Sequence, residues 1–159
     1  MSSTSADRRR SGYAETTLQK AALVVGLVFL VVGVAGFVPG LTSDLGTLSF
    51  ASHHSDAMLL GIFQVSVLHN LVHLLFGIVG VLAARSPGGS RPYLIGGGVV
   101  YFALWLFGLF VAGEASAANF VPLNDADNWL HLALAVGMVG LGVVLGSGRA
   151  ATPKPRTRS

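Results

Sequence analysis

The chain contains no cysteine among its 159 residues, and only 11% of its residues are charged. The first absence excludes disulfide bridges and thiolate metal sites, and it leaves redox chemistry at sulfur to three methionines. The second absence excludes an ordinary water-soluble surface, because soluble domains carry about 25% charged residues. Hydrophobic residues make up 52% of the chain instead. This composition is typical of an integral membrane protein.

The few charged residues are separated by sign along the chain. All ten Lys and Arg lie in three short segments: Arg8, Arg9, Arg10 and Lys20; Arg85 and Arg91; Arg149, Lys154, Arg156 and Arg158. The two intervening segments hold five of the seven acids: Asp44, Asp56, Glu114, Asp125 and Asp127. Because cytoplasmic loops collect Lys and Arg, the pattern predicts that both termini and the 85–91 loop are cytoplasmic. Both acidic loops are then expected outside.

The excess of basic residues could also be taken to indicate nucleic-acid binding, an interpretation that we reject. A sequence pI near 9.8 would suggest nucleic-acid binding in a soluble protein. In a membrane protein, the same basic residues orient the chain and attract anionic lipids of the cytoplasmic leaflet. The expected partner is therefore the lipid bilayer, with a second copy of the chain or another membrane protein as a further candidate, and no nucleic acid.

Four apolar runs predict four membrane spans, at about 18–38, 66–84, 92–111 and 127–146. The first has about 21 residues, enough to cross a hydrocarbon core of about 30 Å. The second run already begins at Met58 and is too long for one perpendicular crossing. We expect residues 58–65 to form an interfacial or re-entrant segment, with Ser66 as the N-cap of the helix. A tilted continuous helix from Met58 is the alternative.

The remaining boundaries follow from local signals. Pro92 suits the first turn of the third span, and Asp127 suits the N-cap of the fourth. The 39–57 loop is polar and turn-prone, with room for a short strand or helix. Residues 1–16 and 149–159 are too polar to bury much surface, which predicts disordered tails around a membrane domain at 17–148. The predicted fold class is an all-α integral membrane four-helix bundle.

Three histidines form the chemical cluster of the chain. His69 and His73 are four residues apart, so they share one helix face near the outer end of the second span. His131 lies at a similar depth in the fourth span. The segment from His69 to His73 has the spacing of the zinc-protease motif His-Glu-x-x-His, but Asn70 replaces the glutamate that would serve as general base. The sequence therefore predicts no enzyme.

Four interpretations of the cluster remain open. The three histidines could bind zinc or copper, with further ligands from a nearby set: His53, His54, Glu114, Asp125 and Asp127. A b-type haem between His73 and His131 is a second metal site to consider. A proton or small-solute pathway is the third, although no Asp, Glu, Lys or Arg lies deep in a span.

We favour the fourth interpretation, a structural polar cluster with no predicted cofactor. Its members are His69, Asn70, His73, Asn128 and His131. Their side chains are expected to hydrogen-bond one another or the outer loops, and so to hold the second helix against the fourth.

Two short echoes suggest an internal repeat. Asn70 to Leu74 and Asn128 to Leu132 share the pattern Asn-x-x-His-Leu, and Phe37-Val38-Pro39 matches Phe120-Val121-Pro122. Together they favour duplication of the first helix pair as the second. The two spacings differ, which requires unequal loops, and short apolar matches also arise by chance.

One segment carries a family resemblance. The residues from Leu59 to Val65, the run Leu68-His69-Asn70-Leu71-Val72-His73 and the later Asp127-Asn128-Trp129-Leu130-His131 resemble domain-of-unknown-function family 4383. The similarity covers roughly residues 18–147. It implies a small four-helix membrane protein of the actinobacterial kind, in the cytoplasmic membrane, with no assigned activity and no catalytic residues to carry over. The expected function is therefore a structural or accessory role in the bacterial cytoplasmic membrane.

Overall fold

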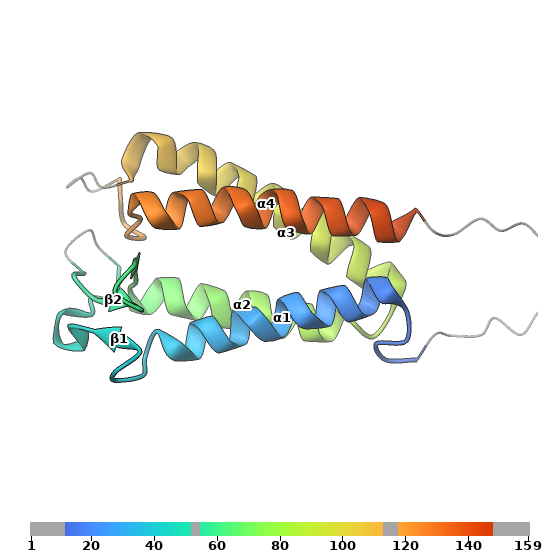
Figure 1. Cartoon of the computed structure of the whole chain (residues 1–159), viewed down its shortest axis with the longest axis horizontal. Helices are drawn as coiled ribbons and strands as arrows, with labels where there is room; N and C mark the ends of the chain where they lie inside the picture. Colours follow the sequence, from blue (N-terminus) through green and yellow to red (C-terminus); the bar gives the residue numbers. More distant parts are fainter. Residues whose placement is uncertain (1–11, 52–54, 113–117, 148–159) are drawn as a thin grey trace, which may run out of the picture.

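The computed structural model describes residues 12–51, 55–112 and 118–147. Four helices make up most of this part of the chain: α1 (Thr17–Ala35), α2 (Val67–Ala83), α3 (Pro87–Val111) and α4 (Asp125–Gly146). The pairs α1–α2 and α3–α4 pack most closely, as two antiparallel hairpins lying side by side (Figure 1). The prediction of an all-α four-helix membrane bundle is confirmed.

The helices differ in how readily they span a bilayer. Within the described ranges, α1, α3 and α4 are long and apolar enough to cross a membrane, whereas α2 is a shorter apolar helix of 17 residues. At about 1.5 Å per residue, α2 extends over about 25 Å, slightly less than the hydrocarbon core. The small sheet adjoins the N-terminal end of this shorter helix.

Two helix starts differ from the expected ones. Ser66 does cap α2, because its hydroxyl accepts a hydrogen bond from the His69 backbone at 3.1 Å. The N-cap of α4 is Asn124 rather than Asp127, which instead occupies the third helical position and completes a capping box with Asn124. The third helix begins at Pro87, capped by Ser86, so that Pro92 lies inside it.

The segment between α1 and α2 folds into a small antiparallel sheet. Its strands are β1 (Thr42–Ser43), β2 (Met58–Leu59) and β3 (Phe63–Gln64), in the order β1-β2-β3, and a 3-10 helix η1 (Leu45–Thr47) follows β1. The alternative of a continuous helix from Met58 is therefore wrong. The first free N–H groups of α2 donate to this segment, Val67 to the Ser49 carbonyl at 3.0 Å and Leu68 to the Phe50 carbonyl at 2.9 Å. The segment thus completes the helix start.

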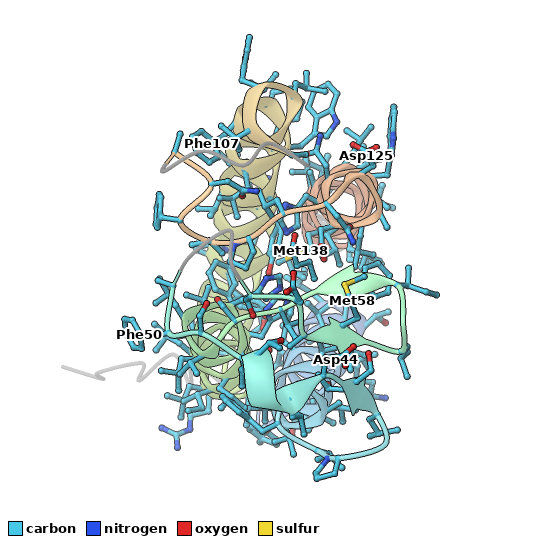
Figure 2. The ribbon with its side chains drawn as sticks, turned by 90° about the vertical axis from the view of Figure 1, so that its left-hand side faces the viewer. Asp44, Phe50, Met58, Phe107, Asp125 and Met138 are labelled. Atoms are coloured by element: carbon cyan, nitrogen blue, oxygen red, sulfur yellow. The ribbon has the colours of Figure 1, made fainter. Side chains whose placement is uncertain are left out.

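Charge is separated between the two ends of the bundle. The described basic residues, Lys20, Arg85 and Arg91, lie at the end where α1 begins and α2 meets α3. Of the described acidic residues, Glu15 lies just before α1, whereas Asp44, Asp56, Asp125 and Asp127 lie at the sheet end, which Figure 2 views directly with Asp44 and Asp125 labelled. The outward faces between the ends are apolar, with Val31, Phe110 and Val144 exposed by 68, 81 and 71%. Such faces suit contact with lipid.

The two hairpins repeat the same contacts in the same register. On the first helix of each, equivalent residues are 72 apart: Gly26 and Gly98, Phe29 and Tyr101, Gly36 and Gly108. On the second helix they are 58 apart: Ser66 and Asn124, Asn70 and Asn128, His73 and His131. Contacts within each hairpin follow the same two offsets. Gly26 lies against the Gly77 carbonyl, and the equivalent Gly98 lies against the equivalent Ala135 carbonyl.

The second echo does not share this register. Phe37-Val38-Pro39 directly follows α1, whereas Phe120-Val121-Pro122 directly precedes α4. The repeat of the two hairpins is therefore supported by the Asn-x-x-His-Leu pattern and the equivalent helix positions, and not by this second match.

Candidate functional site

The histidine cluster belongs to a row of rings that crosses the bundle. His69 and His73 stack with ring centroids 4.6 Å apart and an interplanar angle of 6°. His73 contacts Phe29 of α1 at 5.6 Å, Phe29 stacks on Tyr101 of α3 at 5.4 Å, and Tyr101 contacts His131 of α4 at 5.3 Å. The equivalent residues Phe29 and Tyr101 thus meet face to face where the two hairpins join. All four helices contribute to the row.

His73 has a defined orientation within this row. Its Nδ1 lies 3.0 Å from the backbone carbonyl of His69, one turn earlier in the same helix. A carbonyl only accepts, so Nδ1 carries the proton and donates. In a neutral ring Nε2 is then an acceptor, because neutral imidazole has one donor and one acceptor. His73 therefore presents a lone pair on the ring edge that points away from the backbone of α2.

The two asparagines of the predicted cluster pack within their own hairpins. Asn70 lies against Gly36 at the C-cap of α1, and Asn128 lies against Gly108 of α3. A Cβ at either glycine would overlap the asparagine side chain. Each contact is therefore possible only because the residue facing the asparagine is a glycine. Among the described residues, Asn70 Nδ2 and Asn128 Oδ1 have no hydrogen-bond partner. Both asparagines therefore connect helices by close packing.

Other groups join the two hairpins at the sheet end of the bundle. The Gln64 backbone N–H donates to Asp127 Oδ2 at 3.0 Å, and the Asn124 amide donates to the Ile62 carbonyl at 2.7 Å. In the opposite direction, the His69 ring interacts with the backbone of Pro122. Residues 64 and 122 are 58 apart, as are residues 69 and 127. His69, the third residue of α2, therefore contacts the segment before α4. Asp127, the third residue of α4, contacts the segment before α2.

A cavity of about 140 Å³ lies beside the ring row. The three histidines line it together with seven other residues: Val72, Tyr101, Leu104, Phe107, Phe120, Val121 and Leu123. An apolar cavity of about 150 Å³ holds one benzene ring. A porphyrin is built from several rings of that size, so a cavity of this volume gives no support to the alternative of a haem between His73 and His131.

The predicted metal ligands do not assemble into one set in the described part of the chain. No three His, Cys, Asp or Glu side chains come together there as candidate ligands. Asp127 is engaged with two backbone N–H groups, and Asp125 is exposed. His53, His54 and Glu114 lie outside the described residues. The three central histidines share a cavity without the geometry of a zinc or copper centre.

The sequence indicates the histidine cluster but not the groups that join the hairpins. It suggests Asp127 as a helix cap or metal ligand, and no pattern in it points to the backbone of Gln64. One signal was present, because Asn124 and Asp127 have the three-residue spacing of a capping box. The contact between Asp127 and Gln64 depends on how the small sheet packs, and no local pattern reports that.

Fold and site together define the class: a small polytopic membrane bundle made of two equivalent helical hairpins, with a histidine-lined cavity at one end. A family model described as a domain of unknown function, DUF4383, matches residues 19–144. The chain belongs to this family. No curated protein and no solved structure matches the chain.

Proposed function

We propose that the protein is a non-enzymatic component of the bacterial cytoplasmic membrane with a structural or accessory role. The observation that supports this role is the reciprocal contact between hairpins, in which residues 127 and 69 reach residues 64 and 122. These contacts use polar groups to hold the bundle together at its outer end. A bundle fixed in this way presents a constant apolar surface to lipid and to other membrane proteins.

The same proposal includes an orientation with the sheet end outside. The chain has no native cysteine, so single introduced cysteines report accessibility without background. Gly46 and Gly88 suit this purpose, because a Cβ at Gly46 meets open space and one at Gly88 comes no closer than 4.0 Å to a neighbouring atom. We expect Gly46→Cys to react with an impermeant maleimide in intact spheroplasts, and Gly88→Cys to react only after permeabilisation. The reverse pattern would contradict the proposed orientation.

Replacement of His73 by alanine tests the structural role. The change removes the hydrogen bond to the His69 carbonyl and the ring contacts with His69 and Phe29. We expect a loss of about 2–4 kcal/mol in the free energy of unfolding, as for other large-to-small core substitutions. Denaturation in mixed micelles of increasing SDS fraction measures it. Leu75→Ala is the matched control, because Leu75 lies on the same helix and is 61% exposed to the surroundings.

Metal analysis of the same proteins separates the structural role from a metal site. The full chain is purified without a metal-affinity tag, and the metal content of wild type and His73→Ala is compared. A structural role predicts the same trace metal content in both. Stoichiometric zinc or copper that is present in wild type and lost in the variant would refute it.

A further inference from the structure

We propose that the outer cavity binds a small aromatic alcohol, a single ring bearing a hydroxyl group that donates to Nε2 of His73. Nothing in the structural role requires such a ligand. The proposal is based on three features of the cavity: its volume, the aromatic rings in its wall, and the acceptor nitrogen Nε2 of His73.

The volume sets the size of the ligand. At about 140 Å³, the cavity matches the space that holds one benzene ring. Aromatic side chains form much of the wall, with Tyr101, Phe107 and Phe120 contributing rings. Flat aromatic ligands gain offset or edge-to-face contacts with such walls beyond simple burial. A flat six-membered ring therefore fits better than a branched alkyl group of equal volume.

The hydrogen-bonding requirement sets the ligand's polar group. His73 uses Nδ1 to donate to the His69 carbonyl, while His69 stacks on the ring and Phe29 contacts it. The free edge of the ring carries Nε2, which accepts in the neutral form. An acceptor in an apolar cavity favours a ligand that brings a hydrogen-bond donor. A hydroxyl donor satisfies this nitrogen, whereas an ether or a ketone of the same size does not.

The position of the cavity suggests how such a ligand arrives. Phe107 of α3 and Phe120 before α4 line the cavity and are also 37 and 54% exposed. They connect the cavity to the apolar exterior of the bundle near its outer end. A small aromatic alcohol partitions into the interfacial zone of a bilayer, because it has an apolar ring and one polar group. The cavity therefore opens at the depth where this ligand collects.

The test compares two fluorinated probes on the full chain in lipid nanodiscs. Titration followed by ¹⁹F NMR uses 4-fluorophenol and 4-fluoroanisole, which share the ring but differ in the hydroxyl donor. We expect saturable binding of both, with about fivefold higher affinity for 4-fluorophenol, the equivalent of about 1 kcal/mol for one hydrogen bond. His73→Phe keeps a ring in place and is expected to remove this preference. His131→Phe, a matched change in the same wall, should keep it.

Two further variants separate the cavity from partitioning into lipid. Leu104→Trp fills the cavity and is expected to abolish saturable binding of both probes. Val79→Trp, which lines a different hollow between α2 and α3, should leave binding unchanged. Equal affinities of the two probes in wild type would overturn the proposal, as would loss of the preference in His131→Phe but not in His73→Phe. Absence of saturable binding in folded protein would also overturn it, and would assign the cavity to water.

Discussion

Replacing Gly26 by leucine is expected to prevent the chain from folding into its bundle. A Cβ at this position would lie 2.8 Å from the Val81 backbone nitrogen and 2.9 Å from the Gly77 carbonyl oxygen. Both atoms belong to the backbone of α2, so no side chain can rotate away, and α1 would have to separate from α2. Even one added methyl group in such a contact costs about 1–3 kcal/mol. Total stability of a domain is only about 5–15 kcal/mol.

The measurement is the yield of folded protein by size-exclusion chromatography, with helix content from circular dichroism. Gly26→Ala should fold with a free energy of unfolding lowered by about 1–3 kcal/mol. Gly140→Leu is the control, because a Cβ there meets no atom within 4 Å and the residue lies inside α4. It should fold as well as wild type or better, since leucine favours helix over glycine by up to about 1 kcal/mol. A normal yield of Gly26→Leu would contradict the close contact of α1 and α2.

The second hairpin provides an independent comparison. At Gly98 a Cβ would lie 2.9 Å from the Ala135 carbonyl oxygen and 3.0 Å from the Val139 nitrogen, the equivalents of Gly77 and Val81. Gly98→Ala should therefore cost as much as Gly26→Ala to within about 0.5 kcal/mol, measured under the same conditions. A large difference would show that the two hairpins are not equally packed, although their registers match.

The features predicted correctly from the sequence are those set within one helix. The four-residue spacing of His69 and His73 placed their rings on one face, and they stack in the structure. Ser66 was identified as a cap because hydroxyl groups accept from the first turn. The sheet was not predicted in detail, because its two-residue strands are too short for any periodicity to appear.

The features that escaped prediction depend on contacts between elements. The cavity exists because α2, α3 and α4 meet the segment around Phe120 at the sheet end of the bundle, and glycines such as Gly98 set how closely those helices approach. The sequence shows the glycines but not their partners. The offsets of 72 and 58 residues between equivalent positions likewise depend on which backbone atoms oppose each glycine, and the sequence does not show that. In the sequence itself, the short pattern Asn-x-x-His-Leu is the sign of the repeat that the structure supports.

Replacing Asp127 by alanine is expected to lower the free energy of unfolding by about 2–4 kcal/mol. Asp127 is only 2% exposed, and its Oδ2 accepts from two backbone N–H groups, those of Gln64 at 3.0 Å and Asn124 at 3.3 Å. The change leaves both donors without this acceptor. Loss of an acceptor from a buried N–H costs about 1–3 kcal/mol, and loss of one member of a helix cap about 1 kcal/mol. The first cost falls on the Gln64 N–H and the second on the Asn124 N–H, so together they give about 2–4 kcal/mol.

Two variants show whether this cost comes from the contact between hairpins or from the charge. Asp125→Ala removes a carboxylate in the same helical turn, but the side chain is exposed, so the expected change is below about 0.5 kcal/mol. Asp127→Asn keeps one acceptor oxygen and the shape of the side chain, so it should recover about half of the loss. SDS denaturation of all three proteins compares them directly. Equal stability of Asp127→Ala and Asp125→Ala would mean that the bond to Gln64 does not hold the hairpins together. In that case the attachment would depend on other contacts between the hairpins, among them the hydrogen bond from Asn124 to the Ile62 carbonyl and the ring row from His69 to His131.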